Sequence, residues 1–256
     1  MDSSLSIKPQ DAFDPKFTFA FQPIVDTNTR KVLSYEALIR GPANEPAYQV
    51  LQQVSADRLF AFDRRVRVEA IDLAMRLQLN CHLNLNFLPQ SVDSSPQSIL
   101  TTLEAAGRAN LPVERLVLEV VEGEIIHDHS RFTGLINKYR ALGLKVAIDD
   151  FGAGYSGLNL LADFQPDQVK LDMKLIRGIE HNGPRQSIVR AIDGICLELG
   201  IEVIAEGVET EEEYAWLSSQ GIHLFQGYLF AKPAFACFPP VHYPETLTRT
   251  SLGRTQ

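Results

Sequence analysis

The chain has 256 residues and a formal net charge of −8, with 24 Lys and Arg against 32 Asp and Glu. Its apolar fraction of 45% and charged fraction of 22% are ordinary for a globular protein and exclude a disordered or fibrous one. The acidic balance argues against a general nucleic-acid or anionic-membrane surface, because both need a basic footprint. An anionic ligand fits this charge only if clustered acids carry divalent cations that reverse the local field.

The compartment follows from what the sequence lacks. No apolar run approaches the roughly 18 residues of a membrane span, and the start MDSSLSIKPQ has no basic segment leading into an apolar stretch. The cysteines Cys81, Cys196 and Cys237 are odd in number and widely spaced, which does not make a disulfide framework. We therefore expect a cytoplasmic protein without a membrane span.

The chain opens with a predicted tail and hairpin. Residues 1–16 are polar and contain two prolines, so they are predicted to be an N-terminal tail. Phe17–Val25 alternates like a strand, Asp26–Arg30 is turn-like and Lys31–Ile39 gives a second strand, so we expect an antiparallel hairpin. From Tyr48 to about Gln78, apolar residues recur at helical spacing, as one long helix or two short ones.

Apolar strand-like runs then alternate with helical stretches. The expected strands are His82–Phe87, Arg115–Val121, Leu144–Ile148, Gln168–Leu171, Glu202–Ala205 and His223–Phe225. The expected helices lie near Pro96–Asn110, Ser130–Leu142, Pro184–Leu199 and Glu211–Gln220. Repeated βα units imply a parallel sheet wrapped by helices, and eight strands suit an α/β barrel of the TIM type that the leading hairpin makes irregular. We expect one domain over 17–238 and a C-terminal tail over 239–256.

Polar side chains stand at the ends of the apolar strands. They are Glu36, Asn84, Asn86, Glu119, Glu122, Asp149, Asp150, Lys170, Asp172, Glu206, Glu209 and Gln226. In a parallel barrel all the C-terminal strand ends meet at one face, where such enzymes build their sites. The carboxylates cannot share one cleft as free anions, because like charges at close range disfavour ionisation. Oxygen ligands without Cys or His suit Mg²⁺ or Mn²⁺.

The adjacent Asp149 and Asp150 restrict the geometry. Side chains alternate across a strand, so both can reach a metal only if the chain turns there, and we expect Gly152 and Gly154 to provide that turn. One Asp could bridge two ions roughly 3.5 to 4 Å apart, the spacing used for in-line displacement at phosphorus. Lys170 is expected to orient or help activate the attacking water, or to neutralise phosphate charge. The residue pattern therefore predicts phosphoester hydrolysis.

Several short motifs match one family in order. They are Gln22-Pro23-Ile24-Val25, Glu36-Ala37-Leu38-Ile39-Arg40, Asn86-Phe87-Leu88-Pro89, Glu119-Val120-Val121-Glu122, Asp149-Asp150-Phe151-Gly152-Ala153-Gly154-Tyr155-Ser156, Lys170-Leu171-Asp172, Glu206-Gly207-Val208-Glu209 and Gln226-Gly227-Tyr228. From Phe19 to about Pro233 the chain resembles EAL domains, the bacterial phosphodiesterases that act on cyclic di-GMP. The resemblance implies an irregular (βα)₈ barrel with one antiparallel strand, and an EAL phosphodiesterase domain over 17–238.

The resemblance also implies roles for individual residues. The ligands of two Mg²⁺ or Mn²⁺ ions would be Glu36, Asn86, Glu119, Asp149, Asp150 and Glu206. Lys170 resembles the residue that touches the catalytic water, and Glu36 and Glu209 are the further catalytic candidates. Gln22, Leu38, Arg40 and Gln226 resemble substrate contacts, with Arg40 towards a phosphate. Glu122 resembles the residue that holds the loop after Asp150, through Ser156.

Three positions leave alternatives open. Val121 and Ala153 each stand where the family usually has Thr; neither is a metal ligand, so we expect loop behaviour to change before chemistry does. Asn84 rivals Asn86 as the amide ligand, because both point the same way on one strand. The position of Pro89 sets the family register and favours Asn86.

The function implied by the resemblance is metal-assisted hydrolysis of cyclic di-GMP to linear pGpG, which lowers this second messenger. The alternative is a catalytically silent EAL domain that binds cyclic di-GMP or a protein partner; such a domain is expected to lack a metal ligand or the lysine, and none is missing. Residues 152–157 also match a G-x-G-x-x-G dinucleotide turn, but the preceding Asp149-Asp150 would repel a pyrophosphate. The resemblance makes a homodimer plausible, and control is expected through a separate regulatory protein, the tails or oligomerisation.

Overall fold

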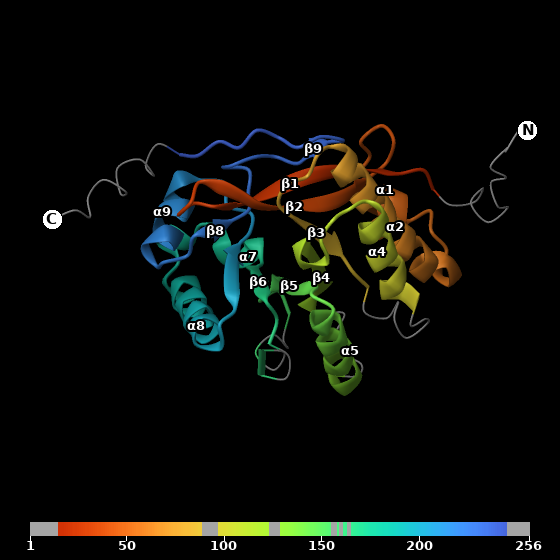
Figure 1. Ribbon diagram of the computed structural model, residues 1–256. Coiled ribbons are helices and arrows are strands. Elements are labelled where there is room, and N and C mark those ends of the chain that lie inside the picture. The colour runs from red at the N-terminus through yellow and green to blue at the C-terminus, as the bar shows by residue number, and fades with distance from the viewer. Residues whose placement is uncertain are drawn as a thin grey trace, which may run out of the picture.

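The backbone forms a sheet that closes on itself. The computed structural model describes residues 15–88, 97–122, 129–154, 158, 161–162 and 165–244. Its strands run in the order β2-β3-β4-β5-β6-β7-β8-β1, and β1 pairs back with β2 (Figure 1). The strands are β1 (Thr18–Asp26), β2 (Lys31–Arg40), β3 (His82–Asn86), β4 (Leu116–Val121), β5 (Lys145–Phe151), β6 (Gln168–Leu171), β7 (Glu202–Ala205) and β8 (Leu224–Phe225). Only β1 is antiparallel to its barrel neighbours, so the predicted irregular barrel with one antiparallel strand is confirmed.

Helices pack around the outside of this barrel (Figure 1). They are α1 (Ala47–Leu51), α2 (Leu59–Arg76), α4 (Gln97–Arg108), α5 (His129–Ala141), α7 (Met173–Ile176), α8 (Gly183–Leu199) and α9 (Glu211–Ser219), with 3₁₀ turns η2 (Ala56–Arg58), η3 (Val113–Arg115) and η5 (Ile179–His181). The helical stretch expected from Tyr48 to Gln78 is therefore broken into two helices. Among the described residues, no helix combines the length and hydropathy needed to cross a membrane.

A short strand lies outside the barrel and was not predicted. β9 (Ala234–Phe235) pairs antiparallel with the first half of β1. Beyond it, the His242 backbone N–H donates to the Phe230 carbonyl at 2.8 Å, and Val241 and Tyr243 pack against the core. The described part of the segment assigned to the C-terminal tail therefore lies against the barrel.

The inside of the barrel changes from apolar to polar along its axis. Ile24, Ile204 and Leu224 form a small buried cluster inside it. Two residues further towards the C-terminal ends of the parallel strands, the same face carries polar groups, because side chains alternate along a strand. On β7 and β8 this step leads to Glu206 and Gln226; on antiparallel β1 it runs backwards in sequence, to Gln22. The apolar layer thus fills the barrel directly below the polar side chains at its C-terminal mouth, and we call it the apolar floor.

A buried arginine joins two of the surrounding helices to the sheet. Arg67 on α2 is 1% exposed and forms an ion pair with Asp63 one turn earlier. Its Nε donates to Thr102 Oγ1 of α4 at 3.0 Å, and its guanidinium lies 4.9 Å from the ring centre of Phe87. These contacts fix α2 beside the end of β3.

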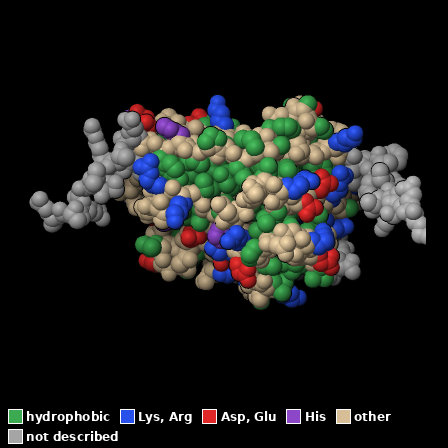
Figure 2. Space-filling model, turned by 45° about the horizontal axis from the view of Figure 1, so that its top comes forward, with side chains coloured by type: hydrophobic (Ala, Val, Ile, Leu, Met, Phe, Trp, Pro, Cys, Tyr) green, Lys and Arg blue, Asp and Glu red, His purple; other side chains and the backbone are tan. Residues whose placement is uncertain are grey.

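The outer surface carries mixed charge. On the face shown in Figure 2, which brings the hairpin side of Figure 1 forward, basic and acidic groups are interspersed around a broad apolar band. Neither sign forms a continuous field on this face. The strongest concentration of acids described below lies instead inside the barrel mouth.

One prediction concerns the close approach of two loops at that mouth. A Cβ added at Gly227 would lie 2.0 Å from the Val208 carbonyl oxygen, so Gly227→Ala is expected to lower the free energy of unfolding by about 3 kcal/mol or more. The matched control is Gly194→Ala in α8, where nothing lies within 4 Å of the added atom. It should raise the free energy by about 0.5–1 kcal/mol. Urea unfolding measures both, and an unchanged midpoint for Gly227→Ala contradicts this packing.

Candidate active site

One buried lysine stands among four carboxylates at the C-terminal mouth of the barrel. Lys170 on β6 is 1% exposed. Its Nζ lies 2.7 Å from Glu206, 2.8 Å from Glu119, 3.0 Å from Asp149 and 3.3 Å from Glu36. These groups come from five different strands or the residues directly after them, so the barrel gathers side chains that lie as far apart as 36 and 206 in the sequence.

The charges in this cluster do not balance. Burial opposes the Lys170 charge, but the carboxylates of Asp149, Glu119, Glu206 and Glu36 outweigh it and hold the lysine pKa well above its ordinary value. Burial and the neighbouring Glu36 raise the pKa of Glu119 to about 8, and burial likewise raises the pKa of Glu206. Full ionisation of all four acids would leave three negative charges uncompensated beside one ammonium, and the raised pKa values of Glu119 and Glu206 reflect burial and this repulsion, which added cations would relieve.

The oxygen atoms are arranged in two overlapping sets. Glu36, Glu119 and Asp149 each offer an oxygen within 4.8 Å of the others, and so do Asp149, Asp150 and Glu206. Asp149 belongs to both sets. In addition, Glu119 Oε2 is buried and has no hydrogen-bond partner among the described residues. Carboxylate donors with an unsatisfied buried oxygen fit a hard divalent cation such as Mg²⁺ or Mn²⁺.

A bulge in β5 brings the two aspartates together. The pairing of β5 with β6 shifts register between Ile148 and Phe151, and Asp150 adopts a positive φ of 54°. The chain therefore turns at Asp150 itself, two residues before Gly152, the first glycine of the expected turn. Gly152 continues the turn with a φ of 91°. This bend allows Asp149 and Asp150 to approach Glu206 together.

Glu122 holds the loop that follows the bulge. Its Oε2 accepts the backbone N–H of Gly152 at 2.9 Å and that of Gly154 at 3.3 Å. The predicted partner Ser156 lies outside the described residues, as does Pro89. Asp172, one of the polar residues at the strand ends, accepts the Lys174 N–H at 2.6 Å and caps α7.

Two amides contact Glu36, and a third contacts one of these two. Gln226 Nε2 donates to Glu36 Oε2 at 2.7 Å and lies 3.5 Å from Gln22 Oε1. Gln22 in turn donates to the Ala231 carbonyl at 3.3 Å. Asn86 Nδ2 lies 3.5 Å from Glu36 Oε1, and its residue is exposed at the mouth. Gln226, named as a substrate contact from the sequence, therefore also holds a carboxylate of the cluster, and Gln22, named with it, contacts Gln226.

Glu209 points to a different part of the mouth. It is 41% exposed and forms an ion pair with Arg177 at 2.8 Å. Its backbone N–H donates to Glu213 Oε2 at 2.9 Å, and Glu213 Oε1 accepts the Gly178 N–H at 3.0 Å. Sequence reasoning missed Arg177 and Glu213. The capping-box pattern of Thr210 and Glu213 was the available signal for the second of them.

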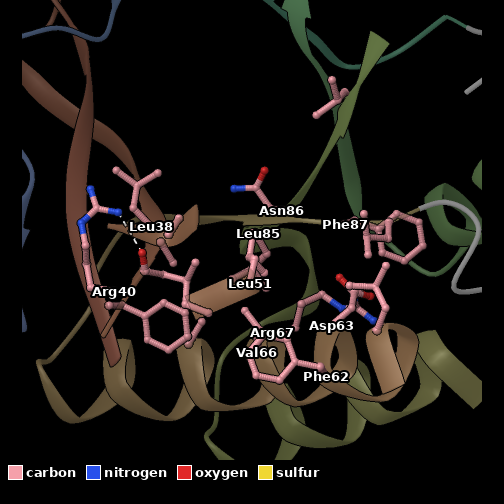
Figure 3. Close-up of a pocket in the computed structure, with 18 residues that line it drawn as sticks. Leu38, Arg40, Leu51, Phe62, Asp63, Val66, Arg67, Leu85, Asn86 and Phe87 are labelled. Carbon is pink, nitrogen blue, oxygen red and sulfur yellow. Dashed lines mark hydrogen bonds and ion pairs between the residues drawn. The ribbon is translucent and has the colours of Figure 1, made fainter. Parts of the chain in front are cut away.

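An apolar cavity of about 360 Å³ opens beside the cluster. Leu38 and Arg40 of β2 and Asn86 of β3 line one side, as Figure 3 shows, and Leu51 and Val66 belong to the helical side. The further lining includes Phe62, Asp63, Arg67, Leu85, Phe87 and Val121. Leu38, Arg40 and Asn86 were named from the sequence, whereas the contribution of α2 was not, because its apolar face looks like ordinary core.

Removing the central ammonium should expose the repulsion among the acids. Lys170→Met is expected to lower the free energy of unfolding of the metal-free protein by about 3–5 kcal/mol, because it leaves buried carboxylates without their cation. Lys145→Met, at the opposite end of the barrel on β5, is the control and should cost much less. Urea unfolding in a chelator measures both. Equal losses in the two variants would contradict the electrostatic role of Lys170.

Comparison with known proteins gives consistent matches. The model of the EAL domain family matches residues 9–233. The antirepressor BluF of Escherichia coli K12, described as regulated by blue light and temperature, is 36% identical over 228 residues, which cover 89% of this chain and 57% of the relative. The cyclic di-GMP phosphodiesterase PA2567 of Pseudomonas aeruginosa is 30% identical over 224 residues, covering 85% and 38%. The chain thus spans about half the length or less of these relatives.

Two solved structures are similar to this chain in both architecture and sequence. A stand-alone EAL protein of Vibrio cholerae O395, in its cyclic di-GMP-bound form, is 47% identical with a TM-score of 0.86, covering 90% of this chain and 97% of that one. Klebsiella pneumoniae BlrP1, in a complex with manganese and cyclic di-GMP, is 40% identical with a TM-score of 0.85, covering 88% and 57%. By its sequence, its barrel and its motifs, the chain belongs to the EAL domain family.

Proposed function

We propose that this protein hydrolyses cyclic di-GMP to linear 5′-pGpG with the help of two divalent cations, Mg²⁺ or Mn²⁺. The observation that carries the proposal is the pair of overlapping oxygen sets around Lys170, which share Asp149. Relatives named as cyclic di-GMP phosphodiesterases supply the substrate class. Burial and the mutual repulsion of the acids, which raise the pKa values of Glu119 and Glu206, are the reason why this site would favour cations.

The ligands in this proposal come from the strand ends. Glu36, Glu119 and Asp149 would hold one ion, and Asp149, Asp150 and Glu206 would hold the other. Asn86, whose Nδ2 lies 3.5 Å from Glu36 Oε1, would complete the first set. Such a pair of ions lowers the pKa of bound water and neutralises charge on the phosphodiester. The shared Asp149 keeps the two sets at a fixed separation, because the β5 bulge fixes its direction.

The chain's own residues orient the reaction. The raised pKa keeps Lys170 protonated, so its Nζ donates hydrogen bonds and orients the attacking water instead of acting as a base. The water proton would leave for a carboxylate, for which Glu36 beside Lys170 is the nearer candidate. Glu209, the other candidate, is paired with Arg177 and would first have to leave that partner. A new P–O bond forms as the P–O3′ bond breaks, and the leaving O3′ takes up a proton. One opened ester yields the linear dinucleotide.

The cavity beside the cluster gives the substrate a place to bind. Its wall is mostly apolar, which suits the face of a nucleobase, and Arg40 at its edge suits a phosphate. Arg40 now donates to the Ile39 carbonyl at 2.8 Å, so its guanidinium is close to the backbone of its own strand. We propose that one guanine occupies this cavity while the phosphodiester reaches the carboxylates.

A regulatory role without hydrolysis is the second candidate. The relative BluF is named an antirepressor, which favours a domain that acts on a protein partner. The carboxylates, the amide and the lysine required for hydrolysis are nevertheless all present in this chain. We therefore place hydrolysis first. We also propose that the protein acts as a homodimer and that a separate regulatory protein controls it.

The direct test is incubation of the purified protein with cyclic di-GMP and Mg²⁺ or Mn²⁺, followed by chromatography. We expect pGpG to accumulate, and a chelator to stop it. Glu36→Gln and Lys170→Met should each lower turnover at least about a hundredfold. Glu202→Gln, at the start of β7 and far from the mouth, is the control and should leave turnover unchanged. Binding of intact cyclic di-GMP without pGpG would favour the regulatory candidate.

Filling the cavity should affect binding more than chemistry. Val66→Trp places a large ring in the cavity wall, and we expect KM for cyclic di-GMP to rise at least about tenfold with a smaller change in kcat. Asp72→Trp adds the same ring at an exposed position of α2 and is the control. Steady-state kinetics separate the two parameters. An unchanged KM in Val66→Trp would contradict the proposal that a guanine binds in this cavity.

A further inference from the structure

A second asparagine lies below the carboxylate cluster, deeper in the barrel than Asn86. Asn84 on β3 is completely buried and pairs in register with Glu36 on β2 and Val117 on β4. Its Nδ2 donates to Glu119 Oε1 at 2.8 Å. Its own Oδ1 is buried and has no hydrogen-bond partner among the described residues. The side chain thus has one polar contact in the described structure, and that contact is with a carboxylate of the cluster.

The two oxygens of Glu119 are in different situations. Oε1 receives Asn84 Nδ2 at 2.8 Å and Lys170 Nζ at 2.8 Å. Oε2 is buried and receives no donor from the described residues. Two donors on one oxygen fix the rotation of the carboxylate about its last bond. Oε2 is then the oxygen left without a donor, and Glu119 offers one oxygen within 4.8 Å of oxygens of Glu36 and Asp149.

We infer that Asn84 is a positioning residue that occupies Glu119 Oε1 and so leaves Oε2 free to bind a cation. This inference rests on the proposed function, because it concerns the same metal site. It also separates the two asparagines that the sequence left as rivals: Asn86 lies at the exposed mouth beside Glu36, whereas Asn84 acts through Glu119 from below. Hydrogen-bond partners of metal ligands typically contribute about 10–100-fold to metal affinity.

An amide suits this position for a physical reason. A hydrophobic residue would leave a charged oxygen in a dry interior with only the lysine as its donor, and a second acid would add to the repulsion. The asparagine amide supplies a donor without adding charge. Its Oδ1 is buried without a partner among the described residues and carries a desolvation cost, so the amide is held here by its donor side alone.

The chain offers a matched control in Gln168. This side chain is 3% exposed and lies on β6 two residues before Lys170, on the same inner face. Its Nε2 donates to Glu202 Oε2 at 2.9 Å, and its Oε1 is likewise buried without a partner. Gln168 and Asn84 therefore make the same kind of contact, one to an acid outside the cluster and the other to an acid within it.

The experiment measures Mn²⁺ affinity without any reaction. Free Mn²⁺ is followed by its electron paramagnetic resonance signal during titration into the full chain and its variants Asn84→Ala, Asn84→Leu and Gln168→Met. Both Asn84 variants should raise the Kd for Mn²⁺ at least about tenfold, and Gln168→Met less than about twofold. Asn84→Ala avoids overpacking if the leucine variant does not fold, and thermal melting in a chelator verifies folding. At saturating Mn²⁺, kcat of Asn84→Ala should return towards that of the unchanged protein.

The outcomes separate this inference from the proposed function. A Kd for Asn84→Ala within about twofold of the unchanged protein, or an equal shift in Gln168→Met, overturns the positioning role alone. In a third outcome, the parent protein binds Mn²⁺ but leaves cyclic di-GMP intact, while the Asn84 variants bind Mn²⁺ more weakly. This outcome overturns hydrolysis and supports the positioning role. An unchanged protein that binds no Mn²⁺ overturns both.

Discussion

The contact of Lys170 with four carboxylates is the constraint on which the site depends. Like charges do not gather by themselves, and each of these acids would be more stable in water. The closure of the sheet forces them together, because the hydrogen bonds of eight strands fix where every strand end lies. The apolar floor of Ile24, Ile204 and Leu224 supports this closure from below. The folding energy of the barrel thus maintains an arrangement that favours cations.

Much of this arrangement could be predicted from the sequence. Period-two alternation identified the hairpin, and apolar runs ending in polar residues identified the parallel strands. Glycine and asparagine are typical of helix C-termini, and Asn110, Gly143, Gly200 and Gly221, at or after the ends of the expected helices, all have positive φ values. The convergence of Glu36, Glu119, Asp149 and Glu206 then follows from the topology of a parallel barrel. These predictions rest on periodicity, which a single sequence reveals.

The features that the sequence did not predict depend on contacts between distant segments. The bulge at Asp150 arises from the pairing of β5 with β6, and no local signal distinguishes it from a turn at the following glycines. The partner of Asn84 is 35 residues away, on the neighbouring strand. The cavity wall on α2 looks like any helix face packed on a sheet, because the space in front of it is not visible in the sequence. The partners of individual side chains and the position of the cavity could therefore be found only from the structure.

The antiparallel pairing of β1 with β2 keeps the turn between these two strands away from the site. Gln22 pairs directly with Glu36 across β1 and β2, while the turn between these strands, held by Asp26 through the Asn28 N–H at 2.9 Å, lies at the other end of the hairpin. Four residues of strand place that turn about 13 Å below the mouth. A foreign peptide, such as a fluorescent reporter, could therefore be spliced between Asn28 and Arg30 without touching the catalytic groups. An insertion in this turn would reach the site only if it shifted the pairing of β1 with β2, because Gln22 and Glu36 are held opposite each other by that register.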